Sequence, residues 1–223
     1  MKVDSINQRK LINNNYAKPS FGNVVVNNIP KNLLKNKNNI YIISGPSGVG
    51  KDTILNAFNE KFNNFFTKVV TSTTRQPRVG EIDGISYNFL TADEFQKGIK
   101  NNEFLEYVNV FADKYYGTRL SDVEKVLQEG KNPILVIDVD GAQKIKSKLK
   151  NVIAIFIKPK SMDTLKAHLE KRGSETAETM KTRLQRAAYE VDAGLDPKRY
   201  DAVIQNNSNI EENVNDLKQI LNL

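Results

Sequence analysis

The sequence predicts an α/β protein with a central parallel sheet. Short apolar runs recur along the chain, and segments with helical periodicity separate them, which is the order expected when all strands are parallel. A glycine-rich segment follows the first run directly and leads into a helical pattern, as a tight strand-to-helix turn requires. The predicted strands are Ile40 to Ser44, Pro133 to Asp138, Val152 to Ile157, and Ala202 to Gln205.

The segment after the first strand has the composition of a phosphate-binding loop. It matches the pattern G-x-x-x-x-G-K, which is normally followed by Ser or Thr. Its glycines allow successive amide N–H groups to turn inward toward phosphate oxygens, and the lysine adds a positive charge for the terminal phosphates. We therefore expect a nucleoside triphosphate at residues 45–51, with a helix over Asp52 to Phe62.

Two stretches interrupt the alternation of strands and helices. Thr71 to Thr118 is dense in Tyr, Phe, Gly and charge, and Leu165 to Ala187 predicts a charged helical pair broken at Gly173. Open α/β sheets bind ligands beyond the carboxyl ends of their strands, so both stretches are candidate covers for a substrate. The remaining helices are predicted to begin at the capping box Ser121 to Glu124, with Gly130 at the end, and to cover Glu211 to Leu223.

The stretch Thr71 to Glu81 predicts a second phosphate site. It holds hydroxyl side chains, one carboxylate and the arginines Arg75 and Arg78 in one predicted loop. Arginine presents a planar set of donors that matches phosphate oxygens, and neighbouring hydroxyls add to it. A solvated polar loop is the alternative that composition alone favours.

Charge and composition restrict the class of protein. Of 33 basic and 26 acidic residues, seven basic residues and Asp4 alone lie in 1–38, so the remaining 26 and 25 nearly balance. We expect no nucleic-acid binding by the core and a disordered basic extension over 1–38, with targeting or RNA contact as a lesser option for it. No cysteine, secretory signal or membrane span is evident, so we expect a cytoplasmic protein.

The order of motifs from about Ile40 to Leu221 resembles guanylate kinases. The resemblance is carried by residues 45–51, 73–78, 80–84, 87–89, 102–107, 115–118, 137–138 and 171–173. It implies a P-loop NTPase fold with a central parallel sheet flanked by helices. The core would cover 39–70, 119–164 and 188–223, with a GMP-binding insertion at 71–118 and a helical lid at 165–187. It also implies transfer of the ATP γ-phosphoryl group to GMP or dGMP, with Mg²⁺.

The resemblance also implies roles for individual residues. Lys51, Arg172 and Arg183 would stabilise the transferring phosphoryl group. The ATP site would consist of Gly45, Pro46, Ser47, Gly48, Val49, Gly50, Lys51, Asp52, Thr53 and Asn206. The GMP phosphate would contact Arg75, Arg78, Tyr87 and Tyr116, joined by Glu81 and Thr71 nearby. The guanine would be read by Glu106 and Asp138, with assistance from Ser72 and Thr118, and Gly117 would permit close approach of the backbone. A carboxylate accepts hydrogen bonds from guanine N1–H and N2, a donor pair that adenine lacks.

Three positions leave alternatives open. Asp138 fits a guanine contact, with water-mediated help to the metal, or a simple cap of the turn into Gly141. Asp52 stands where Ser or Thr normally ligates Mg²⁺, so it is either a metal ligand or a favourable charge at the helix N-terminus. His168 stands where a lid arginine is common, and a mostly neutral imidazole binds phosphate less well.

The rival to an enzyme is a guanylate-kinase-like module that binds proteins and has lost catalysis. The intact Gly50 and Lys51 favour the enzyme, because such modules erode the phosphate-binding loop. A related kinase with a different phosphorylated acceptor is the third option. The oligomeric state stays open, with a homodimer among the possibilities.

Overall fold

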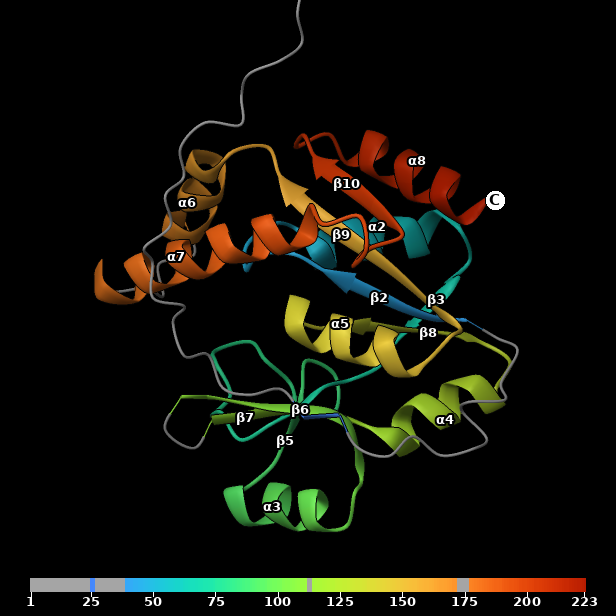
Figure 1. Ribbon diagram of the computed structural model, residues 1–223, viewed down its shortest axis with the longest axis vertical. Coiled ribbons are helices and arrows are strands. Elements are labelled where there is room, and N and C mark those ends of the chain that lie inside the picture. Colours follow the sequence, from blue (N-terminus) through green and yellow to red (C-terminus); the bar gives the residue numbers. More distant parts are fainter. Residues whose placement is uncertain (1–24, 27–38, 112–113, 172–176) are drawn as a thin grey trace, which may run out of the picture.

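The computed structural model describes residues 25–26, 39–111, 114–171 and 177–223 (Figure 1). Within these residues the chain forms two sheets of five strands each. The larger body of Figure 1 holds one sheet with most of the helices, and β6 and β7 lie with α3 at the other end. None of the described helices is long and apolar enough to cross a lipid bilayer.

The central sheet is entirely parallel and confirms the predicted fold class. Its strands lie in the order β10, β9, β2, β8, β3, so the strand that precedes the glycine loop is central. Their bounds are β2 Ile40–Ser44, β3 Phe66–Lys68, β8 Asn132–Val136, β9 Val152–Pro159 and β10 Ala202–Asn206. Each predicted run overlaps one of these strands, although the run Pro133 to Asp138 extends two residues past the end of β8. The short edge strand β3 was not predicted.

Alternate residues of the central strands pack on opposite faces of the sheet. Ile40 and Ile42 join a core with α4 and α5, while Tyr41 and Ile43 join a second core with α2, α6 and α8. A strand buried on both faces reads as a continuous apolar run, which explains why β2 was predicted with its observed bounds. The helices are α2 Lys51–Lys61, α4 Leu120–Gln128, α5 Val139–Lys148, α6 Met162–Lys171, α7 Ala177–Gly194 and α8 Ile210–Leu221.

The first inserted stretch folds into a second, mixed sheet rather than an irregular cover. Its strands lie in the order β1, β6, β7, β4, β5, and only β4 and β5 pair in parallel. Their bounds are β1 Val25–Val26, β4 Ser72–Thr73, β5 Asn88–Phe89, β6 Phe104–Phe111 and β7 Lys114–Arg119, with helix α3 at Ala92–Lys100. The described part of the predicted basic extension is β1, which pairs with β6.

The predicted capping box at Ser121 was wrong. Helix α4 begins one residue earlier, and its N-cap residue Arg119 makes no capping hydrogen bond through its side chain. A complete capping box is present instead at α3, where Thr91 and Glu94 exchange hydrogen bonds between side chain and backbone. Both segments carry the same local signal, and strand β7 runs directly into α4 without leaving a free N-terminal turn.

The second inserted stretch supplies α6 and most of α7. Gly173, the predicted break between the two helices, lies outside the described residues. Helix α7 continues without interruption past Ala187, where the lid was predicted to end, and reaches Gly194. A Cβ atom at Gly194 would lie 2.3 Å from the Phe156 ring, so this end of α7 packs directly on strand β9.

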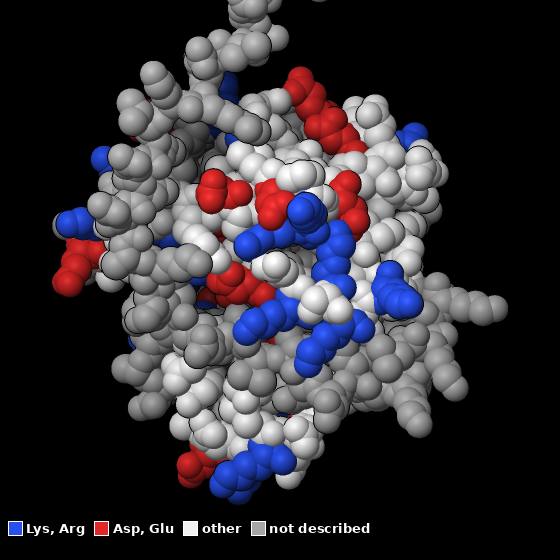
Figure 2. All heavy atoms as spheres, in the orientation of Figure 1, with Lys and Arg blue, Asp and Glu red and all other residues white. Residues whose placement is uncertain are grey.

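Charged side chains of both signs share the face seen in Figure 2. Lys and Arg side chains gather over the region of α5, and Asp and Glu side chains lie beside them. Helix α5 carries Lys144, Lys146 and Lys148 in its sequence, and Lys146 forms a 2.8 Å ion pair with Asp201.

Candidate active site

The glycine loop curls between the end of β2 and the start of α2. Gly48 and Gly50 have φ angles of 86° and 96°, a region that favours glycine. The ammonium group of Lys51 donates to the carbonyl oxygens of Gly45 at 2.6 Å and Pro46 at 3.1 Å. The lysine therefore lies folded over its own loop, at the N-terminus of a helix, where backbone N–H groups favour anions.

A cavity of about 510 Å³ opens beside this loop. It is lined by Gly48, Gly50, Thr53, Ile54, His168, Lys171, Asn206, Ser208, Ile210 and Asn213. Asn206 fixes one wall, because its amide donates to the Val49 carbonyl at 2.7 Å and accepts from Ser208 and Asn213. Helix α6 closes another side through His168, whose Nδ1 lies 3.2 Å from the carbonyl oxygen of Gly48.

Asp52 lies in the first turn of α2 and forms an ion pair with Lys68 of β3. The Nζ and Oδ1 atoms are 2.6 Å apart, and both side chains are exposed to solvent. The Asp52 carboxylate therefore interacts favourably with the N-terminus of α2 and also has Lys68 as a basic partner. No local signal in the sequence connects residue 68 to the loop, and this pairing was not predicted.

The second sheet gathers the predicted phosphate ligands around Arg75. Its guanidinium donates to both carboxylate oxygens of Glu81 at 2.8 Å, and it lies over the Tyr87 ring at 5.3 Å. Tyr116 contacts the ring of Tyr87, with 6.1 Å between the ring centroids. The backbone N–H of Arg78 donates to Glu81, so the two arginines share one carboxylate.

Glu106 of β6 is a buried carboxyl group, with only 4% of the residue exposed. Thr118 donates to its Oε1 at 2.8 Å. The pKa of Glu106 is raised to about 8, chiefly by burial and also by the nearby Asp138 charge, while the hydrogen bond from Thr118 opposes the shift. The buried hydroxyl of Ser72 has no hydrogen-bond partner among the described residues, so it is available to bond to a ligand.

Gly117 allows strands β6 and β7 to approach closely at this position. A Cβ atom there would lie 2.9 Å from the Glu106 carbonyl oxygen and 2.9 Å from the Phe104 ring. The backbone approach expected for Gly117 is thus made by the protein's own neighbouring strand. Thr71 lies just before β4, and its carbonyl accepts a hydrogen bond from the Asn88 N–H.

Asp138 caps helix α5, as its alternative interpretation predicted. Its Oδ1 accepts from the Gly141 N–H at 2.7 Å, while its Oδ2 lies 3.6 Å from Arg186. Burial raises the pKa of Asp138, and the Gly141 hydrogen bond and the Arg186 charge oppose that shift. Capping uses only one carboxylate oxygen, so the cap does not exclude a second role.

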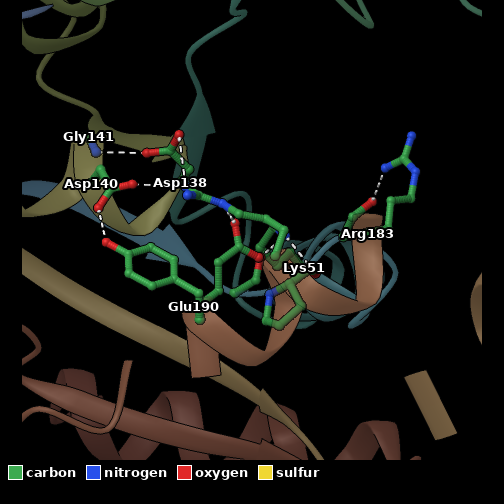
Figure 3. A network of polar contacts seen from close by, with 11 residues as sticks. Lys51, Asp138, Asp140, Gly141, Arg183 and Glu190 are labelled. Atoms are coloured by element: carbon green, nitrogen blue, oxygen red, sulfur yellow. Dashed lines mark hydrogen bonds and ion pairs between the residues drawn. The ribbon is translucent and has the colours of Figure 1, made fainter. Parts of the chain in front are cut away.

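Helix α7 brings Arg183 to the glycine loop and Arg186 to the start of α5. Arg183 donates to the Ser47 hydroxyl in the glycine loop at 3.3 Å, and Figure 3 shows it at one end of a polar network that includes Lys51 and Asp138. Arg186 and Glu190 lie within this network, and sequence reasoning assigned no site role to Glu190. Arg172, the other predicted lid arginine, lies outside the described residues.

The fold and the loop together define a P-loop α/β protein. Residues 37–223 match the family model described as guanylate kinase, and the chain belongs to the guanylate kinase family. It is 45% identical to a guanylate kinase of Clostridium perfringens (strain SM101) over 88% of this chain and 87% of that protein. It is 38% identical to a guanylate kinase of Fusobacterium nucleatum over 82% of this chain and 95% of that protein.

A solved structure agrees with this assignment. The guanylate kinase of Anaplasma phagocytophilum superimposes with a TM-score of 0.62 at 32% sequence identity, covering 85% of this chain and 87% of that one. The family and the fold that the motifs predicted are therefore confirmed.

Proposed function

We propose that this protein transfers the γ-phosphoryl group of ATP to GMP, or to dGMP, and releases ADP and GDP or dGDP. One observation carries the proposal. A phosphate-binding loop with its lysine and a second sheet with an arginine–tyrosine cluster beside a buried carboxylate occur in one chain of this family. Two separate anion sites match a reaction between two nucleotides.

The donor half is proposed to bind ATP through the glycine loop and the adjoining cavity. Lys51 would exchange its bonds to the loop carbonyls for phosphate oxygens, since both are acceptors at the same turn. Arg183 reaches the loop at Ser47 and is placed to offset charge that develops during transfer. Arg172 keeps the same proposed role, and the cavity beside Asn206 is proposed to take the adenine.

The acceptor half is proposed to hold the GMP phosphate between Arg75, Arg78, Tyr87 and Tyr116. Both Glu81 oxygens accept from the Nη2 of Arg75, so the position of the guanidinium is set before the phosphate arrives. Glu106 would accept hydrogen bonds from guanine, with Thr118 fixing the carboxylate and Ser72 offering its unpaired hydroxyl. The GMP phosphate is an anionic nucleophile near neutral pH, so no general base is required.

The residues present fit a magnesium ion that enters with ATP. Mg²⁺ commonly takes one or two carboxylates, several waters and substrate phosphates, and it does not need a cage of protein ligands. The described residues accordingly contain no group of three or more metal-binding side chains, yet Asp52 and Asp138 adjoin the loop and the sheet edge. When bound, the ion neutralises phosphate charge, and Asp52 or Asp138 would hold it directly or through water.

A coupled assay of ADP release tests this proposal. Purified protein with Mg-ATP should turn over GMP and dGMP, and it should turn over AMP, UMP and a sugar phosphate far more slowly. Equal turnover of AMP would contradict the guanine-reading role of Glu106. No turnover with any acceptor would favour the protein-binding module instead. Light scattering would determine the oligomeric state, which the sequence leaves open with a homodimer among the possibilities. Cytoplasmic location stays a proposal based on the cysteine-free composition.

A further inference from the structure

Arg186 lies among three carboxylates in the interior of the polar network. Its guanidinium is 3.0 Å from Asp140, 3.1 Å from Glu190 and 3.6 Å from Asp138, and only 16% of its side chain is exposed. The guanidinium is held in one orientation, because its Nε donates to Glu190 and its Nη2 donates to Asp140, while Asp138 lies at ion-pair distance from the same Nη2. The network therefore fixes the guanidinium more firmly than a single surface ion pair would.

The two ends of this network belong to different halves of the site. Figure 3 shows Asp138 and Asp140 at one end, and Lys51 and Arg183 at the other. Glu190 is buried, with 8% of the residue exposed, and lies within the electrostatic range of Lys51. Asp138 is also close enough to interact electrostatically with Glu106, the buried carboxyl group on strand β6 of the mixed sheet. Arg186 is thus placed between the phosphate-binding lysine and the proposed guanine site.

The same helix also contacts the glycine loop directly. Arg183 precedes Arg186 by three residues, so the two side chains lie on neighbouring turns of one face of α7. Arg183 bonds to Ser47 of the loop, and Arg186 bonds to the carboxylates that begin α5. Any displacement of α7 at the loop must therefore displace the guanidinium beside Asp138.

Asp138 is held from two sides. The Gly141 N–H fixes its Oδ1, and Arg186 lies against its Oδ2. Asp140 is fixed in a similar way, because the Tyr189 hydroxyl donates to its Oδ1 at 2.6 Å and Arg186 donates to its Oδ2. Without the guanidinium, Asp138 would be held only by backbone N–H groups at the start of α5, and the direction of its Oδ2 would be less well fixed.

We infer that Arg186 is a positioning residue that sets the Asp138 carboxylate for the guanine and couples acceptor binding to donor binding through α7. This inference rests on the proposed function, and it deepens it by assigning the link between the two nucleotide sites. Arg186 itself contacts neither nucleotide. Its effect is on the affinity for GMP and on the gain in that affinity when the donor site is filled.

The test compares three variants of the full chain. Arg186→Met removes the charge, Arg186→Lys restores it without the planar donors, and Lys181→Met removes a charge from an exposed position of the same helix. Calorimetry would measure GMP affinity alone and with a saturating β,γ-imido analogue of ATP. Steady-state assays would separate KM for GMP from kcat, and thermal unfolding would report stability.

We expect Arg186→Met to weaken GMP binding about tenfold and to remove most of the gain produced by the ATP analogue. KM for GMP should rise much more than kcat falls. Arg186→Lys should recover part of the affinity, and Lys181→Met should match the unsubstituted protein. A purely structural role would lower the unfolding temperature while leaving GMP affinity and its coupling within twofold of the unsubstituted values, and that result would overturn the inference.

A second variant covers the case in which Arg186→Met does not fold. Asp140→Asn leaves the arginine in place but weakens one of its fixed contacts, so GMP affinity should fall about threefold in the same direction. Unchanged GMP affinity in that folded variant would also overturn the inference. Failure of the proposed function is distinct, because it would appear as absent GMP turnover in the unsubstituted protein.

Discussion

Thr118 donates a 2.8 Å hydrogen bond to the carboxyl group of Glu106, and both residues are buried in the mixed sheet. The hydroxyl uses one carboxyl oxygen and leaves the other, Oε2, within 3.8 Å of where a Cβ atom of Gly141 would lie. The pair therefore connects the acceptor sheet to the start of α5, close to Asp138. Specificity for the base is expected to depend on this pair.

Replacement of Glu106 by glutamine tests base recognition. The amide keeps the shape of the side chain but replaces an acceptor oxygen by a donor, which opposes the guanine N–H groups. We expect kcat/KM for GMP to fall about 100-fold, because a guanine N–H group that loses its acceptor in a buried site costs about 1–3 kcal/mol. The ratio of GMP to AMP turnover should fall with it. The exposed variant Glu129→Gln serves as the control, and an unchanged ratio in Glu106→Gln would refute the assignment.

The raised pKa of Glu106 predicts a pH-dependent stability. The folded protein retains this proton up to about pH 8, whereas the unfolded chain releases it near the ordinary value of 4.5. Unfolding therefore releases a proton between these values, so stability should fall as pH rises from about 4.5 to 8 and level off above. For one such group the slope is about 1.4 kcal/mol per pH unit.

Urea unfolding between pH 5 and 8 measures this slope. Glu190, whose pKa burial raises to about 7, contributes with the same sign over a narrower range. The slope should therefore be smaller in Glu106→Gln than in the unsubstituted protein, without vanishing. Equal slopes in the two proteins would show that Glu106 is ionised in the fold.

The ion pair between Asp52 and Lys68 predicts a compensating pair of substitutions. Asp52→Ser restores the hydroxyl usual in phosphate loops and should keep kcat within about tenfold, because an exposed ion pair contributes little. Lys68→Met should raise KM for ATP about fivefold, since it leaves a carboxylate uncompensated beside the triphosphate. Combining both changes should return KM for ATP toward its original value.

Binding of ATP with and without Mg²⁺ gives a second readout for these variants. Lys68→Met should weaken ATP binding in the presence of EDTA more than in the presence of Mg²⁺, because the ion offsets the same charge. Complete loss of activity in Asp52→Ser would contradict this account and would identify Asp52 as an essential metal ligand.

Close packing at Gly117 predicts a loss of stability on its replacement by alanine. The added methyl group would meet the Glu106 carbonyl oxygen and the rings of Phe104 and Phe95 at 3.0 Å or less. Relief requires backbone movement between β6 and β7, so we expect a loss of about 1–3 kcal/mol in the free energy of unfolding. Urea unfolding measures it, and a change below about 0.5 kcal/mol would show that the strands separate easily.

Local sequence patterns predicted those elements whose residues are all buried or all exposed in the same way. Strand β2 is buried on both faces, so its apolar run and the glycines after it mark their own positions. The prediction of a capping box at Ser121 was wrong because strand β7 runs directly into α4 there. The same sequence pattern does form a capping box at Thr91, where no strand leads directly into the helix. Edge strand β3 has three residues and leaves too short a pattern to detect.

The parts of the site that were not predicted depend on contacts distant in sequence. Glu190 resembles any charged helical residue until packing buries it against Arg186, and Lys68 meets Asp52 only because β3 lies on the edge of the sheet. Buried charge pairs carry no local sequence pattern of their own. Arg75 was a candidate phosphate ligand from the local composition of 71–81, whereas Glu106 was predicted only through the order of family motifs.

The tight contact of Gly194 with the ring of Phe156 gives α7 a fixed pivot at its carboxyl end. At 1.5 Å per residue, the opposite end of this helix lies about 25 Å away. A tilt of roughly 10° about that pivot would sweep the far end through about 4 Å while hardly moving the residues beside the sheet. A tilt of this helix would therefore give a large displacement at its amino-terminal end and a small one near Gly194.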